Sequence, residues 1–521
     1  MHRQSGDCRC LCDVRKSMEE KDQKYLRRLE EKLEENYPQQ KETLQSIVAI
    51  ESVVSPQDGS APFGKGVQKA FEYMLQKGKA LGMDTYNGEN YGGHIELKAD
   101  EPGAETMAIL VHLDTVPIGE GWTKDSLGKD MKDGVFYGRG VADDKGPAIE
   151  ALYAMKAIAD CGFTRHKNIR LILGLDEETQ WMGMERYKEL CDPPNFGFTP
   201  DADFPAIHGE KGIMIFDIAK KLSAGNGQGL VLKKMKGGSA PNMVAGSATA
   251  ILGASDSQLY EEVQRQATQW KEEGRMDVAA RRRGKSLEIK TTGVLAHGAR
   301  PDLGKNAISQ LMEFLGTLHL ANEEAAEFIE FYNQYIGYEI HGESLGISQE
   351  DQLSGPTTVT VGLLEMNQEA VQITINCRYP VTGSSSVVYT GMQPILEKYN
   401  LGLVKNLNEK PLLVDKDSHL VETLMDAYRY HTGDADSQPI VIGGGTYARA
   451  FDNVVAFGAL FPEEEDVMHQ ADEHIKESSF KKATKIYADA IYRLACSDAS
   501  AENQEIDEGN QYEATTEKSG V

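Results

Sequence analysis

Two patterns of apolar residues take turns along the chain. Continuous apolar runs predict strands, and apolar residues at helical spacing predict helices. The uninterrupted apolar run at 107–111, and the run at 169–173 that only Arg170 interrupts, are typical of strands that are buried on both faces of a sheet. Residues 147–159, and a later stretch around Trp181 and Tyr187, carry apolar positions at helical spacing. This β-α-β-α order predicts an α/β fold class with a mainly parallel central sheet.

The pattern changes at about residue 212, where short strands of alternating apolar and polar residues dominate. Such strands are expected at 287–291, 358–361 and 371–378, with helical stretches such as 307–318 between them. From about residue 411 the α/β pattern returns. The sequence therefore predicts one α/β domain, formed by 18–211 and 411–496, that is interrupted by an inserted α+β domain at 212–410.

Both ends of the chain are predicted to be disordered extensions. Residues 1–17 contain Cys8, Cys10 and Cys12, a weak metal signal because no later cysteine pair or histidine cluster accompanies it. Residues 497–521 carry seven acids against one lysine and too few apolar residues to form a core.

The charge and hydropathy of the chain argue against nucleic acids and membranes as partners. The net charge of −26 disfavours nucleic acid and anionic membranes, because a strongly acidic surface repels phosphate groups. No apolar run approaches the roughly 20 residues of a membrane helix, and the N-terminal residues have no apolar signal core. We therefore expect a cytoplasmic enzyme with a small-molecule substrate.

The first candidate for chemistry is the pair that ends the run at 107–111. In a strand, residues two apart point to the same side, so His112 and Asp114 can meet at the strand's end. This is one way to build a metal-binding imidazole whose second nitrogen is held by a carboxylate. A hydrogen-bonded histidine without a metal is the commoner use of such a pair.

Two further acidic pairs lie at positions that favour a functional site. Asp143 and Asp144 come just before a predicted helix, where one of them can cap the helix and the other can bridge two cations. Glu177 and Glu178 follow the buried run at 169–173, and adjacent side chains diverge. One glutamate can then bind a metal while the other moves protons.

Residues 198–212 add Asp201 and Asp203, with His208 nearby, and a later segment adds His469 after another apolar strand. Together with the acids above, these residues offer a set of two imidazoles and three carboxylates. Zinc, cobalt and manganese accept such ligands, and two cations together can polarise a carbonyl and activate water. The sequence has no H-E-x-x-H, no C-x-x-C pair and no G-x-S-x-G, which argues against single-zinc peptidases and serine hydrolases.

Several longer motifs resemble one enzyme superfamily. V-H-L-D-T-V-P, G-R-G-V-A-D-D-K-G, G-L-D-E-E and A-H-G-A-R-P are similar to motifs of the aminoacylases, carboxypeptidase G and succinyl-diaminopimelate desuccinylase. G-F-T-P-D-A-D-F-P-A-I-H-G-E-K-G, G-G-G-T-Y-A-R and F-G-A-L-F-P-E-E-E-D-V-M-H-Q resemble the PepV-type dipeptidases. The resemblance covers residues 25–494.

The resemblance implies a catalytic domain that holds two divalent cations. Zn²⁺ is expected, with Mn²⁺ or Co²⁺ as alternatives. The implied roles are His112 and Asp201 on one metal, Glu178 and His469 on the other, Asp143 bridging both, Asp114 clamping the His112 ring, and Glu177 as general base.

The inserted domain is implied to be a lid over that centre. His297 is expected to stabilise the tetrahedral oxyanion, and Arg378 to bind the substrate's terminal carboxylate through a bidentate contact. Asn242, Gly445 and Thr446 are expected near the substrate; a plain glycine-rich turn is the alternative for the last two. PepV-type enzymes complete the site within one chain, so we expect a monomer.

Together these features predict a dinuclear-metal dipeptidase that hydrolyses unblocked dipeptides. An N-acyl-amino-acid amidohydrolase, acting as a deacylase or desuccinylase with the same metals, is the nearest alternative. A metal-binding protein that has lost catalysis is a remote one. The sequence identifies neither the metal nor the preferred side chains of the dipeptide.

Overall fold

The structure of the chain, a computed structural model, describes residues 7–223 and 229–497. Its contacts divide the chain into two compact units. Unit 1 comprises the chain up to His208, Val414–Ile440 and the part from Thr446 onward, and unit 2 comprises Gly209–Leu413 and Val441–Gly445. The boundaries predicted at 212 and 410 lie close to these, but the short segment Val441–Gly445 groups with unit 2.

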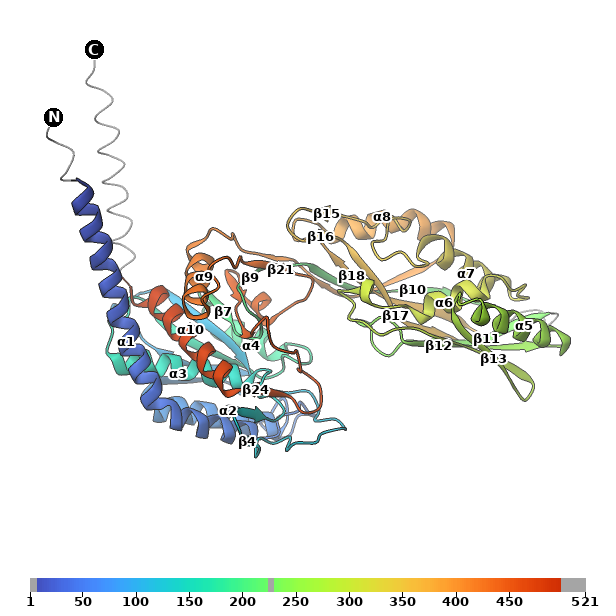
Figure 1. Cartoon of the computed structure of the whole chain (residues 1–521). Coiled ribbons are helices and arrows are strands. Elements are labelled where there is room, and N and C mark those ends of the chain that lie inside the picture. Colours follow the sequence, from blue (N-terminus) through green and yellow to red (C-terminus); the bar gives the residue numbers. More distant parts are fainter. Residues whose placement is uncertain (1–6, 224–228, 498–521) are drawn as a thin grey trace, which may run out of the picture. The chain divides into compact units, whose positions relative to one another are not determined.

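The centre of unit 1 is a mixed sheet, visible in Figure 1. Its strands, in spatial order, are β1 (Asp84–Gly88), β2 (Gly92–Leu97), β6 (Asn168–Gly174), β3 (Thr106–His112), β7 (Phe196–Thr199), β22 (Val454–Ala456) and β9 (Ile207–Glu210). The central strands β6, β3, β7 and β22 are parallel, and the flanking strands are antiparallel. The predicted parallel arrangement thus holds for the strands that precede the candidate site.

Helices surround this sheet, and the longer ones share one apolar core with it. They are α1 (Asp7–Val48), α2 (Lys65–Ala80), α3 (Lys145–Cys161), α4 (Met182–Leu190), α9 (His419–Thr432), α10 (Glu477–Ala495) and the short 3₁₀ helix η2 (Tyr447–Ala450). Two smaller groups of strands complete the unit: β4 (Met131–Lys132), β5 (Val135–Tyr137) and β24 (His474–Lys476), and β8 (Ala202–Asp203) and β23 (Ala459–Leu460). The central sheet itself continues past β9, which also pairs with β20 (Leu412–Leu413) and β21 (Ile440–Ile442).

The first helix differs from the sequence prediction. Residues 7–17, expected to be disordered, form the beginning of α1 in the structure. Downstream in the same helix Tyr25, Leu26, Leu29 and Leu33 are buried in the core of unit 1. A helix that is anchored by packing extends at little cost, since each added residue gains a hydrogen bond after nucleation. Residues 1–6 lie outside the described residues, and so do residues 498–521, which make up nearly all of the predicted acidic tail.

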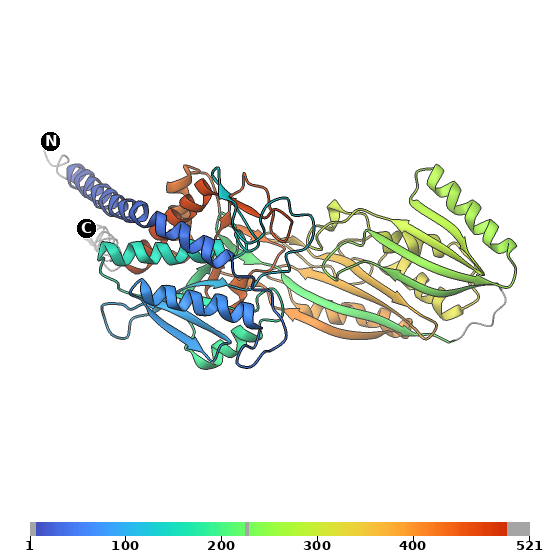
Figure 2. The same ribbon diagram turned by 90° about the horizontal axis from the view of Figure 1, so that it is seen from below.

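Unit 2 is built on an eight-stranded antiparallel sheet with its own apolar core. The strands, in spatial order, are β13 (Asp277–Arg283), β14 (Ser286–Thr292), β12 (Ser247–Ala254), β11 (Leu230–Gly237), β17 (Thr358–Met366), β18 (Ala370–Tyr379), β10 (Gly212–Lys221) and β19 (Gly402–Glu409). Figure 2 shows this sheet from below. The other elements are α5 (Gln258–Glu272), α6 (Ala307–Leu315), α7 (Glu323–Tyr335), α8 (Ser385–Lys398), the 3₁₀ helix η1 (Pro301–Leu303), β15 (Glu350–Asp351) and β16 (Gly355–Pro356).

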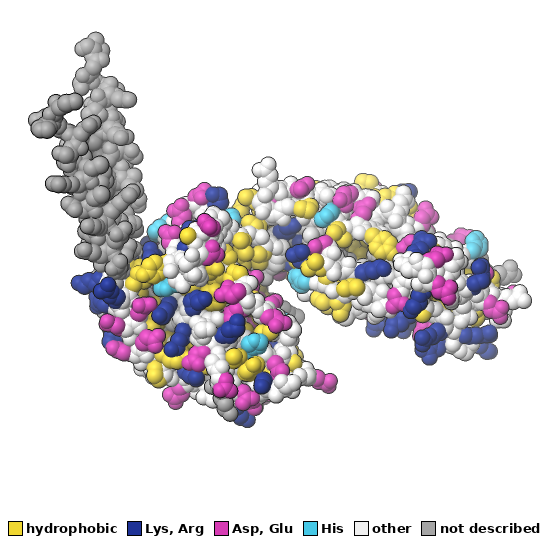
Figure 3. Space-filling model, in the orientation of Figure 1, with side chains coloured by type: hydrophobic (Ala, Val, Ile, Leu, Met, Phe, Trp, Pro, Cys, Tyr) yellow, Lys and Arg dark blue, Asp and Glu magenta, His cyan; other side chains and the backbone are white. Residues whose placement is uncertain are grey.

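The negative charge of the chain is not uniform over its surface. Basic side chains gather over the part of unit 2 that carries β11 to β13, at the lower right of Figure 3. Strand β13 ends with three consecutive arginines, Arg281, Arg282 and Arg283. Among the residues described, no helix combines the length and the apolar character needed to cross a membrane.

One buried carboxylate connects the helices of unit 1, and its removal tests their packing. Asp489 of α10 is fully buried; Oδ1 accepts from the Tyr25 hydroxyl at 2.8 Å and from Arg493 Nε at 2.7 Å. We expect Asp489→Asn to lower the free energy of unfolding by about 3 kcal/mol, because it removes the charge opposite a partly buried cationic group. Asp160→Asn, in a partly exposed pair with Lys156, should cost less than about 1 kcal/mol.

The pH dependence of that loss provides a second check. Burial opposes ionisation of Asp489, but contacts with His431 and Arg493 hold its pKa below the ordinary value. A lowered folded-state pKa adds stability above the unfolded pKa of about 3.9, and this stability is lost as the pH falls through the folded value. In urea titrations the difference between wild type and Asp489→Asn should therefore shrink below about pH 4. A difference that does not change with pH would contradict this role.

Candidate active site

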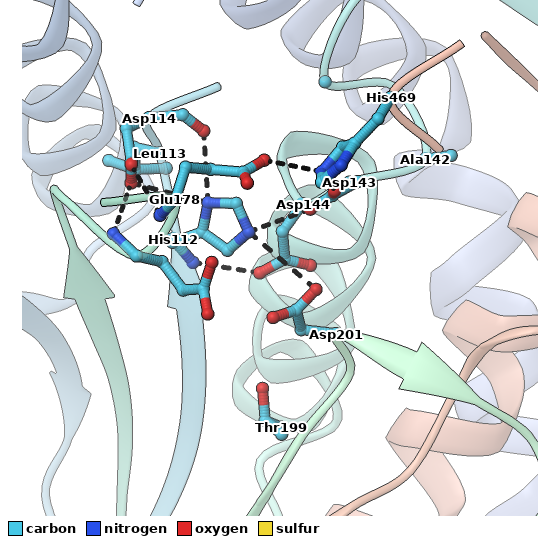
Figure 4. Close-up of polar contacts among 12 residues, drawn as sticks. His112, Leu113, Asp114, Ala142, Asp143, Asp144, Glu178, Thr199, Asp201 and His469 are labelled. Carbon is cyan, nitrogen blue, oxygen red and sulfur yellow. Dashed lines mark hydrogen bonds and ion pairs between the residues drawn. The ribbon is translucent and has the colours of Figure 1, made fainter. Parts of the chain in front are cut away.

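The candidate ligands of unit 1 converge because parallel strands end at the same edge of a sheet. His112 is the last residue of β3, Glu177 and Glu178 follow β6, and Asp201 follows β7. Asp143 comes from the loop before α3, and His469 from the segment before β24. Figure 4 shows the labelled side chains of these segments turned toward one another.

The ligand atoms form two groups that share one residue. In the first, His112 Nε2 lies 2.9 Å from Asp143 Oδ1 and 3.8 Å from Asp201 Oδ1. In the second, His469 Nε2 lies 2.8 Å from Asp143 Oδ2 and 3.0 Å from Glu178 Oε1. Within each group the atoms all lie within 4.8 Å of one another. Asp143 thus directs one oxygen to each group, as a bridging carboxylate would.

The electrostatics of the cluster also suit cations. Burial, reinforced by the charges of Asp143 and Glu178, raises the pKa of Asp201 to about 6. Hydrogen bonding to Asp143 and Glu178 raises the pKa of His469 to about 10. Both shifts have the direction that concentrated negative charge produces, and bound cations offset such charge. In number, type and spacing, the residues present fit a pair of divalent metal ions.

Asp114 holds this cluster through its backbone as well as its carboxylate. His112 Nδ1 donates to the carbonyl oxygen of Asp114 at 3.1 Å, while the nearer carboxylate oxygen lies 3.5 Å away. A carbonyl can only accept, so Nδ1 carries the hydrogen and Nε2 faces the ligand group. The carboxylate of Asp114 also accepts from the backbone N–H groups of Glu177 and Glu178, each at 3.1 Å. Asp114 thus contacts the His112 ring through both its carbonyl and its carboxylate.

Glu177 lies beside the two groups without belonging to either. Burial and the negative charge of Asp201 raise its pKa well above the ordinary value. Its backbone is fixed on both sides, because its N–H binds Asp114 and its carbonyl accepts from Trp181 Nε1 at 2.8 Å. A buried glutamate with a raised pKa beside such groups is a candidate for proton transfer.

Most of the predicted substrate residues belong to unit 2. Arg378 is buried; its NH1 donates to the carbonyl of Gly443 at 2.6 Å and its Nε to Asn376 at 3.1 Å. The loops of His297 and Asn242 are joined where the N–H of Gly298 donates to the Asn242 carbonyl at 2.7 Å. Burial and the nearby charge of Arg378 lower the pKa of His297.

Gly445 ends the short segment of unit 2 that begins with Val441, whereas Thr446 belongs to unit 1. The Thr446 hydroxyl accepts from the N–H of Ala448 at 3.2 Å and caps η2. This contact gives Thr446 a structural role at the start of η2.

Other polar residues around the site were assigned no function from the sequence. Asp144 is fully buried and one of its oxygens accepts from the N–H of His112 at 2.9 Å. His208 is buried, with Nδ1 bonded to the carbonyl of Val414 at 2.8 Å. Glu473 is a buried carboxylate that contacts the loop of Asp143, and no sequence pattern indicated a role for it. The only signal was its position four residues after His469, in a chain with 81 acids.

Comparisons with known proteins place the chain in a family. The model of "Peptidase family M20/M25/M40" matches residues 108–493. A protein of Staphylococcus haemolyticus that is provisionally named a dipeptidase is 35% identical over 471 residues, covering 89% of this chain and 98% of its own. A protein of Staphylococcus saprophyticus with the same provisional name is 35% identical over 458 residues, covering 87% and 96%.

Solved structures share the fold at low sequence identity. Human carnosine dipeptidase 1 has a TM-score of 0.54 at 16% identity, with 90% of this chain and 98% of that chain covered. Aminoacylhistidine dipeptidase from Vibrio alginolyticus has a TM-score of 0.52 at 13% identity, with 87% and 95% covered. With a family model that matches most of its length, and relatives at 35% identity over nearly all of theirs, this chain belongs to the peptidase family M20/M25/M40.

Proposed function

We propose that this peptidase is a dinuclear-metal dipeptidase that hydrolyses unblocked dipeptides. The observation that carries the proposal is the pair of ligand groups sharing Asp143, with Glu177 beside them, in a chain whose relatives are provisionally named dipeptidases. Zinc as the metal, a monomeric state and a cytoplasmic location belong to the same proposal and rest on the sequence.

His112 and Asp201 would hold one divalent cation, Glu178 and His469 the other, and Asp143 both. When bound, the cations would polarise the scissile carbonyl and make an attacking water more acidic. Glu177 takes the proton of that water and delivers it to the leaving amine. Asp114 keeps the His112 ring and the backbone of Glu177 in place for this transfer.

The substrate is bound by residues of unit 2. Arg378 recognises the terminal carboxylate, and His297 stabilises the developing oxyanion. The lowered pKa of His297 favours a neutral ring, which can still donate a hydrogen bond from one nitrogen. Asn242, Gly445 and Thr446 provide further polar contacts to the dipeptide.

The role of Glu177 can be separated from metal binding by comparing two adjacent substitutions. Glu177→Gln should lower kcat by about 10²- to 10⁴-fold and leave the metal content unchanged, because only the proton acceptor is lost. The matched Glu178→Gln should lose metal as well as activity, since it removes a ligand. Steady-state kinetics and elemental analysis of both variants provide the test. Near-normal turnover of Glu177→Gln would show that another group is the base.

The role of Arg378 can be tested through the substrate's carboxylate. Arg378→Ala should raise KM for free dipeptides by about 10- to 100-fold, the loss expected for a charge-assisted contact. Amidated dipeptides, which lack that charge, should be much less affected. Arg300→Ala is a suitable control, because Arg300 lies in the same unit but is exposed and paired with Asp302. Equal effects on free and amidated substrates would contradict carboxylate recognition.

Metal dependence and substrate class can be examined together. Removal of metal by a chelator should abolish hydrolysis, and Zn²⁺, Mn²⁺ or Co²⁺ should restore it at two ions per chain. The reconstituted enzyme should cleave free dipeptides faster than N-acetyl or N-succinyl amino acids. A preference for the acylated compounds would identify an amidohydrolase instead, and a metal-loaded chain inert to both panels would identify a protein without catalysis.

A further inference from the structure

Asp472 and Glu473 lie three and four residues after His469, and both form hydrogen bonds to neighbouring loops. Asp472 accepts from the N–H and the hydroxyl of Thr123, each at 2.7 Å, and from the N–H of Lys124 at 2.9 Å. Glu473 faces the loop that carries Asp143. The segment that provides one metal ligand is thus bonded directly to the loop that provides another.

Both carboxylate oxygens of Glu473 accept hydrogen bonds from the loop of Asp143. Its Oε1 accepts from the backbone N–H groups of Gly140 at 3.0 Å, Ala142 at 2.9 Å and Asp143 at 3.3 Å. Its Oε2 accepts from Arg139 NH1 at 2.5 Å. Glu473 is fully buried and Arg139 nearly so, which means that water cannot replace these partners without opening the loop.

The second ligand group depends on this contact more than the first does. In the first group, His112 ends a central strand and its side chain is fully buried. In the second group, His469 is on a loop and 53% of its side chain is exposed. Within the described part of the chain, Glu473 provides the bond from the 469–473 segment to the backbone N–H of Asp143.

We infer that Glu473 is a positioning residue for the second metal ion, the one that Asp143, Glu178 and His469 would bind. It fixes the backbone of Asp143 relative to His469, so that both present their ligand atoms in one place. This inference rests on the proposed function, because it concerns a metal ion at that site. Residues that orient metal ligands typically change metal affinity by about 10- to 100-fold when altered.

The nature of the contact indicates which substitution is informative. A glutamine in place of Glu473 would keep one acceptor oxygen, but its amide NH₂ group could not accept from either the backbone donors or Arg139. Glu473→Gln therefore disturbs the loop while preserving side-chain volume. The matched control is Glu96→Gln, since Glu96 is also a buried glutamate of unit 1 that pairs with an arginine, Arg170, at 2.8 Å.

The test is a titration of the metal-free full-length chain with Zn²⁺, followed by calorimetry, with unfolding temperatures measured in parallel. Wild type should bind two ions. Glu473→Gln should bind the ion of the second ligand group about 10- to 100-fold more weakly, with a clearly smaller loss for the ion of the first group, which shares Asp143, and excess Zn²⁺ should restore its turnover. Glu96→Gln should be destabilised but bind both ions as wild type does.

Each other outcome has a defined meaning. Two ions bound by Glu473→Gln with wild-type affinities, together with a lowered unfolding temperature, would overturn the inference and leave the proposed function intact. A wild type that binds no metal would instead overturn the proposed function. If Glu473→Gln does not fold, Arg139→Gln replaces it: the same selective weakening of the second ion supports the inference, and two unchanged affinities overturn it.

Discussion

The site depends on a single carboxylate that faces two imidazoles. Asp143 has one oxygen 2.9 Å from His112 and the other 2.8 Å from His469, although these histidines are far apart in sequence. Each ligand group contains only three residues, so neither is complete without Asp143. The parallel strands, the loop before α3 and the segment before β24 must all be correctly placed for this one residue to serve both groups.

Much of this arrangement could be predicted from sequence, because polar residues that directly follow a buried strand lie at the edge of the sheet where sites form. The apolar runs before His112 and before Glu177 end at the sheet edge where functional groups of α/β proteins gather. His469 and Asp201 follow shorter strands, and their roles came from the resemblance rather than from pattern. The sequence pattern likewise could not decide which of the adjacent residues Glu177 and Glu178 is the expected general base and which is the expected metal ligand.

What the sequence did not reveal are contacts between side chains and distant backbone groups. Glu473 bonds to N–H groups more than 300 positions away, and no periodicity or local motif encodes such a pairing. The sequence pattern placed the Asp114 carboxylate near the His112 ring, but it did not reveal that this carboxylate also accepts from two backbone amides or that the Asp114 carbonyl contacts the ring. Every backbone group offers the same donor and acceptor, so only the fold decides which side chain meets it.

The concentration of acids that makes the site suitable for cations also opposes folding. Burial raises the pKa of Glu177 and of Asp201, which shows that their ionised forms are disfavoured in the folded chain. A ligand that binds only the folded state offsets such a cost through its binding free energy. The carboxylates are therefore a source of instability by themselves and a source of stability with cations, and the backbone contacts of Asp114 and Glu473 hold them in place in either case.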